Sequence, residues 1–363
     1  MNYLHDRNLG VSLPIPDFDF ETPCFVINED AMKHNLRITA ELAGGVHRLA
    51  PHVKTHRAPW VTEWLIERGV TTFKAATPRE VEMIVESGAK EAIWAYPTTN
   101  ASAIERVVKA SVAHPEVQIT ALVDDIAGLE VWKKKLAENP GSRLKLRVDL
   151  DPGLGRTGIQ IGETAIHLAL KIDELNCFGG WHVYDGHIKD LDLDLREKNV
   201  LDNINRISAM LADTRLCNLT QDLIGGGSYT YPIWAKHTDA KVGPGSWIYS
   251  SSQHHVELKD QNWQIAAYLL STVVSERAET ATLDAGSKAI APDMPINKRF
   301  SGVDTIVNIN EEHAIVIDSE AIIGDVIALI PRHACTTAYL HRRALVLTSE
   351  GDWVIKEQLG CER

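Results

Sequence analysis

Short apolar runs alternate with amphipathic segments along the chain from about residue 46 to about residue 250. The runs have the length of strands. In the segments between them, apolar residues recur every three or four positions, which predicts helices. Two such helices are expected at Pro78–Ser87 and Ala103–Val112, the first with Thr77 as N-cap and proline as its first residue. Eight strands are predicted, at Val46–Lys54, Thr71–Ala76, Glu91–Tyr96, Gln118–Val123, Arg143–Asp151, Phe178–Tyr184, Gln221–Gly225 and Lys241–Tyr249.

Eight strand–helix repeats favour a (β/α)8 barrel, with an open doubly wound sheet as the alternative. From about Ile265 the pattern changes to short runs typical of antiparallel strands with tight turns, such as the turn at 350–352. We therefore predict a barrel at residues 26–255 and a β domain formed by residues 1–25 and 256–363. The strand-like segment Thr22–Ile27 fits either domain.

Composition narrows the function classes. The chain has 363 residues and a net charge of −12, which disfavours a nucleic-acid partner. No apolar run reaches the roughly 20 residues of a membrane span, and the N-terminal segment shows no secretory signal pattern. Five scattered cysteines without a C-x-x-C pair fit a reducing compartment. We expect a cytoplasmic protein that binds neither membrane nor nucleic acid.

A basic cluster, PHVKTHR, ends the first predicted strand at residues 51–57. In a β/α barrel, catalytic groups lie at the C-terminal ends of strands. Lys54 lies there between two histidines, and neighbouring cations lower the pKa of a lysine, as a Schiff-base amine requires. A solvated basic loop is the alternative, and composition alone favours it.

Two further segments follow predicted strands. The glycine-rich DPGLGRTG, at 151–158, would return Arg156 over the barrel mouth, where a guanidinium can bind a carboxylate or a ring nitrogen. YDGH, at 184–187, would bring Tyr184 and His187 to the same mouth, with His187 as an acid or base. An ordinary turn and a structurally satisfied histidine are the alternatives.

A run of three glycines, GGGSYTY, follows the seventh predicted strand at residues 225–231. Glycines leave backbone N–H groups uncovered, so the run can bind an anion. Barrels often place a phosphate at the loops after strands 7 and 8. A phosphate site and a plain flexible turn are about equally favoured.

The segment PRHACTT lies in the predicted β domain. On a strand, His333 and Cys335 would point to the same side and could hold one zinc ion, with water or substrate as further ligands. A buried cysteine beside a surface histidine is the alternative, and composition favours it.

These segments, in this order, resemble one family, the D-threonine aldolase and D-serine dehydratase group of pyridoxal phosphate enzymes with the alanine-racemase fold type. The matching motifs are PHVKTHR, DPGLGRTG, VYDGH, GGGSYTY, LDAGSKA and IPRHACTT, which run from residue 51 to residue 337. The resemblance implies a (β/α)8 barrel followed by a β domain, a homodimer, and a small D-amino acid as substrate.

The resemblance also implies the roles of single residues. Lys54 would carry pyridoxal phosphate as a Schiff base. A divalent metal would lie near the substrate hydroxyl; cysteine ligation favours zinc, and manganese is the alternative. The remaining contacts are implied for Arg156 and Tyr184 on the cofactor ring, Gly226, Gly227 and Ser228 on its phosphate, and His333 and Cys335 on the metal.

Within the family, the motifs favour different reactions. The barrel motifs resemble those of D-threonine aldolases, which cleave a D-3-hydroxy amino acid to glycine and an aldehyde. Cys335, where aldolases more typically carry aspartate, and Asp190, where they tend to carry a second histidine, resemble the dehydratases. We predict aldol cleavage, with dehydration of D-serine or 3-hydroxyaspartate as the close alternative. A racemase, a non-catalytic cofactor carrier and a metal-only hydrolase agree less well with the motifs.

Overall fold

The computed structural model describes residues 3–6, 11–318 and 320–363. The chain divides into two compact units. The β unit comprises the chain up to Thr39 together with Thr55–Trp60 and Ser246–Glu362, and the barrel unit comprises Ala40–Lys54 and Val61–Gly245, with Arg363. The domain boundaries that the sequence suggested, at residues 25–26 and 255–256, stay a prediction.

The barrel unit contains a parallel sheet whose strands follow one another in chain order. One further segment closes the ring, because Leu49 bridges β11 at Val242 and His52 bridges β4 at Lys74. The (β/α)8 barrel predicted from the sequence is therefore confirmed. The strands are β4 (Thr72–Ala75), β5 (Glu91–Trp94), β6 (Gln118–Val123), β7 (Lys145–Asp151), β9 (Phe178–Val183), β10 (Leu223–Gly225) and β11 (Lys241–Val242), and the short β8 (Ile159–Gln160) pairs with β7.

The first predicted strand, Val46–Lys54, is reduced to these two bridges. Short 3-10 helices flank them, η1 (Val46–Arg48) and η2 (Val53–Thr55). Pro51 lacks an N–H and takes part in the sheet through its carbonyl alone, which accepts the N–H of Lys74 at 2.8 Å. Lys54 therefore lies on a helical turn just past the strand segment rather than on a strand.

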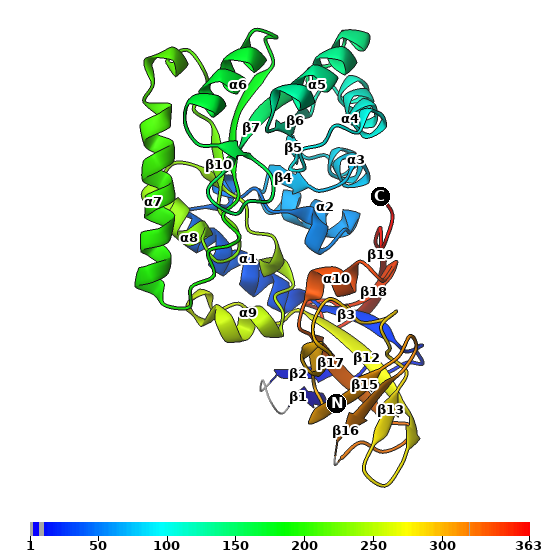
Figure 1. Cartoon of the computed structure of the whole chain (residues 1–363). Coiled ribbons are helices and arrows are strands. Elements are labelled where there is room, and N and C mark those ends of the chain that lie inside the picture. Colours follow the sequence, from blue (N-terminus) through cyan, green and yellow to red (C-terminus); the bar gives the residue numbers. More distant parts are fainter. Residues whose placement is uncertain (1–2, 7–10, 319) are drawn as a thin grey trace. The chain divides into compact units, whose positions relative to one another are not determined.

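Helices cover the outside of the strands. Figure 1 shows α3, α4, α5 and α6 beside one another outside the sheet. The predicted cap is confirmed at α3, where Thr77 Oγ1 accepts the N–H of Glu80 at 3.2 Å and Pro78 is the first helical residue. The helices are α2 (Pro59–Glu67), α3 (Pro78–Glu86), α4 (Ala101–Ala113), α5 (Ile126–Glu138), α6 (Glu163–Asp173), α7 (Leu193–Leu211) and α8 (Tyr231–His237).

One layer of the barrel is held by ion pairs. The Arg147 side chain is 2% exposed, and its Nη2 lies 2.8 Å from Glu91 and 2.5 Å from Asp222. Its Nε donates to Thr120 at 3.1 Å, and Lys241 binds the second oxygen of Glu91 at 2.6 Å. Each charge of this layer thus has partners inside the protein, which a buried charge needs.

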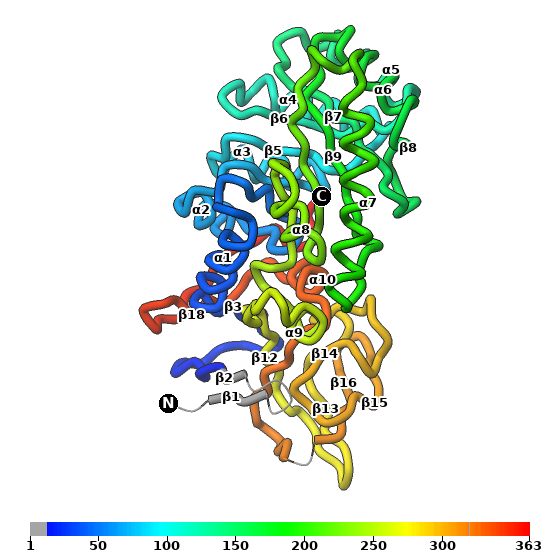
Figure 2. The backbone as a smooth tube through the Cα atoms, turned by 90° about the vertical axis from the view of Figure 1, so that its left-hand side faces the viewer, coloured from blue at the N-terminus to red at the C-terminus, as the bar shows by residue number. Residues whose placement is uncertain are grey.

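The β unit contains a mixed sheet. Its strands are mostly antiparallel, as predicted, but β3 pairs in parallel with β18. The segment that fitted either domain therefore belongs here, since β3 also pairs with β12. The strands, partly visible in Figure 2, are β3 (Cys24–Asn28), β12 (Ala267–Glu276), β13 (Ala281–Leu283), β14 (Phe300–Ser301), β15 (Thr305–Ile309), β16 (Ala314–Ile317), β17 (Val326–Pro331), β18 (Arg343–Leu347) and β19 (Trp353–Glu357).

Apolar side chains of β3, β12, β17 and β18 form the core of this unit, among them Val26, Tyr268, Leu270, Ile330 and Leu345. The other elements are the hairpin β1 (Tyr3–Asp6) and β2 (Val11–Pro14), and the helices α1 (Glu29–Ala43), α9 (Ser252–Glu257) and α10 (Ala334–Ala338). Within the described ranges, none of the helices combines the length and apolar character that crossing a membrane requires.

We predict that Arg147→Met destabilises the barrel by roughly 1–3 kcal/mol, because it removes the buried guanidinium that binds the carboxylates of Glu91 and Asp222. Urea unfolding followed by circular dichroism measures the loss. Arg215 also binds two carboxylates, Glu163 and Asp213, but on the surface. Arg215→Met should therefore cost much less, and equal losses in the two variants would contradict the role given to burial.

Candidate active site

A buried pair of polar side chains lies inside the barrel. Asp149 on β7 and His182 on β9 are register partners in the sheet, and Asp149 Oδ1 lies 2.7 Å from His182 Nδ1. Burial lowers the pKa of His182 to about 4, and the Lys74 charge adds to this effect while Asp149 opposes it. The ring is therefore neutral near pH 7. Its Nε2 is buried and has no hydrogen-bond partner among the described residues.

The loop that carries Arg156 is fixed on both sides of that residue. Thr157 Oγ1 donates to Asp149 Oδ2 at 3.1 Å, and the N–H of Gly158 donates to Asp124 at 3.0 Å. Gly158 has a φ of +102°, and a Cβ there would lie 2.7 Å from the backbone nitrogen of Asp151. A side chain at this position would therefore displace the loop.

Arg156 and Tyr184 come together, as the sequence suggested. The guanidinium carbon of Arg156 lies 5.1 Å from the centre of the Tyr184 ring. Arg156 is exposed and Tyr184 is half-buried. An exposed cation held over an aromatic ring is available to bind a charged ligand.

The three-glycine loop is shaped by two aromatic rings. A Cβ at Gly226 would lie 2.9 Å from the Trp234 ring, and a Cβ at Gly227 would lie 2.8 Å from the Tyr184 ring. Close packing thus requires glycine at Gly226 and Gly227. The anion expected from the sequence would require uncovered backbone at the same positions. Ser228 is half-buried at the end of the same loop.

Part of the expected anion cradle is already hydrogen-bonded within the protein. The N–H of Gly227 donates to Thr230 Oγ1 at 2.9 Å, and that hydroxyl donates to Asp185 at 2.6 Å. Trp234 Nε1 also donates to Asp185, at 2.7 Å. Burial raises the pKa of Asp185, although these hydrogen bonds oppose the rise. The aspartate of the YDGH motif therefore fixes the glycine loop.

Lys54 and its basic neighbours differ from the expected cluster of cations. Lys54 is exposed, and its backbone N–H donates to His52 Nδ1 at 3.3 Å. Burial lowers the pKa of His56 to about 3, so that ring carries no charge at neutral pH. Arg57 donates to the backbone carbonyls of Gly360 and Glu362, which occupies its guanidinium.

His187 is exposed, and its Nε2 would lie 3.7 Å from a Cβ placed at Gly153. It therefore lies beside the loop that carries Arg156. The sequence did not single out the buried His182, because a histidine within the apolar run FGGWHV has the appearance of a core residue. Its register with Asp149 becomes visible only when β7 and β9 are paired.

Lys74 is the second residue that the sequence did not reveal. It lies on β4, is 2% exposed, and its Nζ is 5.9 Å from the centre of the Tyr184 ring. Burial, together with the Lys54 charge, lowers the pKa of Lys74 to about 7. In sequence, a lysine within the short apolar run of a strand looks the same whether its side chain is buried or solvated.

The His333 and Cys335 pair lies in the β unit, but not on a strand as predicted. β17 ends at Pro331, His333 is the N-cap of α10, and Cys335 is inside that helix. The two side chains are nevertheless close enough for each to shift the pKa of the other. The Cys335 thiol donates to Thr55 Oγ1 at 3.2 Å and lies 3.5 Å from Ser246 Oγ.

A carboxylate orients the imidazole of this pair. Asp293 Oδ2 lies 2.5 Å from His333 Nδ1, and its other oxygen accepts from Thr336 at 3.1 Å. Burial opposes the charged form of His333, but Cys335 and Asp293 outweigh it and raise the pKa of His333 to about 9. Burial likewise opposes the thiolate, but His333 and two hydroxyls lower the pKa of Cys335 to about 7.

No cluster of three or more His, Cys, Asp or Glu side chains in the described part of the chain is arranged to hold a metal ion. A metal at His333 and Cys335 stays a prediction.

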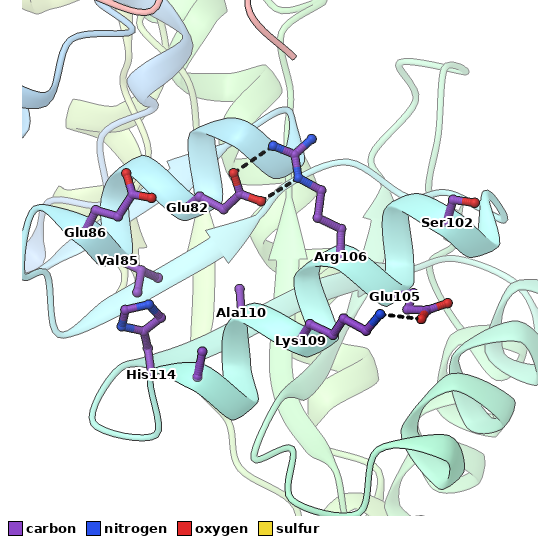
Figure 3. A pocket seen from close by; sticks show the side chains of 10 residues that line it. Glu82, Val85, Glu86, Ser102, Glu105, Arg106, Lys109, Ala110 and His114 are labelled. Carbon is purple, nitrogen blue, oxygen red and sulfur yellow. Dashed lines mark hydrogen bonds and ion pairs between the residues drawn. The ribbon is translucent and has the colours of Figure 1, made fainter.

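A surface cavity of about 580 Å³ lies between α3 and α4 and contains none of the predicted site residues. Figure 3 shows two of its cations paired with carboxylates, Arg106 with Glu82 and Lys109 with Glu105. This pairing leaves the cavity little capacity to bind a charged ligand.

Comparison with known families agrees with this geometry. Residues 27–253, more than half of the chain, match the family model described as alanine racemase, N-terminal domain. The chain belongs to this family. Residues 266–347, in the β unit, match a second model, described as a putative serine dehydratase domain.

Individual relatives of this family member align over nearly the whole chain. A 3-hydroxy-D-aspartate aldolase of Paracoccus denitrificans is 24% identical over 357 residues, which are 92% of this chain and 91% of the relative. The D-threonine aldolase of Filomicrobium marinum has a similar structure, with a TM-score of 0.83, 20% identity, and coverage of 94% of this chain and 95% of the other.

The D-threo-3-hydroxyaspartate dehydratase of Delftia sp. HT23 is also similar, with a TM-score of 0.75 and 20% identity, covering 94% of this chain and 98% of the other. These similarities confirm the alanine-racemase fold type that the motifs suggested. They include both an aldolase and a dehydratase, so the fold alone does not separate the two reactions.

We predict that the family member loses stability as the pH falls from about 6.5 to about 4, because the unfolded chain binds a proton at position 182 that the folded chain does not. The slope from this ring is roughly 1.4 kcal/mol per pH unit. Urea unfolding at several pH values measures it. His182→Asn keeps a donor for Asp149 and should reduce the slope by this amount, leaving the contribution of His56, whose pKa burial lowers to about 3.

His114, on an exposed turn beside Glu116, offers the matched control. His114→Asn should keep the wild-type dependence on pH. An unchanged slope in His182→Asn would show that His182 is not the buried neutral ring described above.

Proposed function

We propose that this chain is a pyridoxal phosphate-dependent and divalent-metal-dependent lyase that cleaves a D-3-hydroxy amino acid into glycine and an aldehyde. The observation that carries the proposal is the set of unpartnered polar groups inside a barrel of this family, above all the buried Nε2 of His182. The relatives named aldolase and dehydratase supply the reaction class. A homodimer and a cytoplasmic location stay predictions.

The residues of the barrel mouth fit the cofactor. The glycine loop presents backbone that no side chain of its own covers, and Trp234 and Tyr184 pack against Gly226 and Gly227. Lys54 is an exposed amine on a turn at the end of a strand segment. Bound pyridoxal phosphate supplies a ring that accepts the electron pair released at the substrate α-carbon.

Each residue then has a role of its own. Lys54 would hold the aldehyde carbon, and the loop at Gly226, Gly227 and Ser228 the phosphate. Because the N–H of Gly227 already donates to Thr230, the phosphate would be held mainly by the other groups of this loop. Arg156 and Tyr184 would border the ring, and His187, exposed beside the Arg156 loop, would move a proton to or from substrate.

The metal would be held by His333 and Cys335. Asp293 already binds Nδ1 of the imidazole, so Nε2 and the Cys335 sulfur would be the donors to the ion. A thiolate and an imidazole together favour zinc. A Lewis acid at this pair would bind the substrate hydroxyl and favour loss of its proton, so that this oxygen could become the aldehyde carbonyl as the carbon–carbon bond breaks.

Dehydration to a 2-oxo acid and ammonia is the second candidate, and Asp190 favours it. The Asp190 carboxylate accepts from Asn199 at 3.0 Å, and its carbonyl accepts from Arg196 at 2.7 Å. Asp190 therefore anchors the start of α7 and does not supply the second histidine that aldolases tend to carry there. A structure of a related dehydratase is described as a cysteine mutant in the metal-free form.

We predict that Lys54 carries the cofactor. The purified protein should absorb visible light, and borohydride should fix a pyridoxyl label that mass spectrometry finds on Lys54. Lys54→Ala should abolish both the label and turnover. A label of wild-type extent in Lys54→Ala, or one found on Lys74 in the wild-type protein, would contradict the assignment.

We predict glycine and an aldehyde as products when D-threonine, D-serine and D-3-hydroxyaspartate are supplied in turn. Retro-aldol cleavage of D-threonine gives glycine and acetaldehyde, whereas dehydration gives 2-oxobutyrate and ammonia. Aldehyde, glycine, 2-oxo acid and ammonia are measured in parallel. Ammonia with an equal amount of 2-oxo acid, and no glycine, would replace the aldolase proposal by the dehydratase one.

The same assay tests the metal. A chelator, or the variant Cys335→Ser, should remove turnover while the visible absorbance of the cofactor remains, and added zinc should restore the chelated protein. Cys217 is exposed and far from this segment in sequence, so Cys217→Ser is the matched control and should keep full activity. Full activity in the presence of chelator would exclude a catalytic metal.

A further inference from the structure

Lys74 occupies a place inside the barrel that the proposed roles leave unexplained. All four residues of β4 are buried, and Lys74 is 2% exposed although a lysine is almost never fully buried without a partner. It bridges His52 on the strand segment that closes the barrel, two residues before Lys54. Lys74 and Lys54 therefore belong to neighbouring segments of the barrel.

The space for the Lys74 amine is left by a glycine. A Cβ at Gly243 would lie 2.8 Å from Lys74 Nζ and 3.1 Å from its Cδ. The N–H of Gly243 donates to the carbonyl of Gly225 at 3.1 Å, at the start of the glycine loop. The Tyr184 ring, which lies against Gly227, is 5.9 Å from the amine. Lys74 thus points toward the groups proposed to border the cofactor.

The charges around Lys74 do not neutralise it. Asp149 is engaged by His182 and Thr157, and Asp185 by Thr230 and Trp234. No ion pair or hydrogen bond joins the Lys74 amine to another residue in the described ranges. The charged and titratable groups that act on it are Lys54, Asp149, Arg156, His182 and Asp185, and Tyr184 is the nearest aromatic ring.

The contrast with Arg147 is informative. Arg147 is equally buried but is bound by two carboxylates. A buried cation without a counter-ion is costly, and here burial and Lys54 lower the pKa of Lys74 to about 7. A bound ligand with a hydrogen-bond acceptor would give this amine the partner that the protein does not supply, which would favour binding of that ligand.

We propose that Lys74 binds pyridoxal phosphate, with its amine donating a hydrogen bond to an acceptor on the pyridine ring, either the ring nitrogen or the 3-oxide. The inference rests on the proposed function. The phosphate has its own loop, whereas Lys74 lies beside the segment of Lys54, the residue that holds the ring aldehyde. Binding of the cofactor supplies the acceptor that the amine lacks, so the protein takes up a proton at Lys74 when the cofactor binds.

The test measures cofactor affinity rather than turnover. Wild-type apoprotein and Lys74→Met are titrated with pyridoxal phosphate, with an analogue that has carbon in place of the ring nitrogen, and with the 3-deoxy analogue. Lys74→Met should bind pyridoxal phosphate roughly tenfold or more weakly. This difference should disappear for the one analogue that lacks the acceptor, which identifies it. Lys145 on β7 is exposed, and Lys145→Met should bind as the wild type does.

A second measurement uses the wild-type protein and does not depend on the variant's fold. Calorimetric titrations with pyridoxal phosphate at about pH 8, in buffers of different ionisation enthalpy, report the protons taken up, and uptake should be smaller in Lys74→Met. Equal affinity and equal proton uptake in the two proteins would overturn the proposal, as would a loss of affinity that is the same for all three ligands. A wild-type protein without a borohydride-fixed label on Lys54 would instead overturn the proposed function.

Discussion

The carboxylate of Asp149 is the group on which the arrangement of the barrel mouth depends. One oxygen holds the neutral ring of His182, and the other holds Thr157, next to Arg156. Both contacts follow from the register of β7 with β9 and from a glycine loop that only a left-handed Gly158 permits. A single buried side chain thereby fixes a ring inside the barrel and the loop that carries Arg156.

The interior of the barrel contains two kinds of polar layer. The Arg147 guanidinium binds two carboxylates and a hydroxyl, so this layer stabilises the fold and has no group left to bind a ligand. Around Lys74 and His182, the lysine side chain is 2% exposed without an ion pair among the described residues, and the buried Nε2 of the imidazole has no hydrogen-bond partner there. Natural proteins satisfy most buried polar groups. A ligand bound inside the barrel would supply partners for both groups, which supports the proposed place of the cofactor.

Much of the fold could be predicted from the chain. Strand-length apolar runs with amphipathic segments between them specify a β/α barrel, and the cap at Thr77 follows from local chemistry alone. The short helices at Lys54 and at Cys335 could not be predicted in this way. Pro51 offers only its carbonyl to the sheet, β17 ends at Pro331, and the residues that follow each proline form a helical turn instead of a strand. Local turns of this kind depend on contacts that a periodic pattern does not contain.

The candidate site was predicted only where it lies in glycine-rich loops. Arg156, Tyr184 and the loop at 226–228 have recognisable neighbours in sequence, whereas His182 and Lys74 lie in apolar strands, where alternation alone cannot show that they face the same space. The measurement that tests the central claim most directly is a crystal structure of the protein grown with pyridoxal phosphate. The account predicts continuous density from Lys54 to the cofactor, its phosphate at the glycine loop and its ring beside His182 and Lys74. Cofactor bound elsewhere, with His182 and Lys74 still unpartnered, would contradict it.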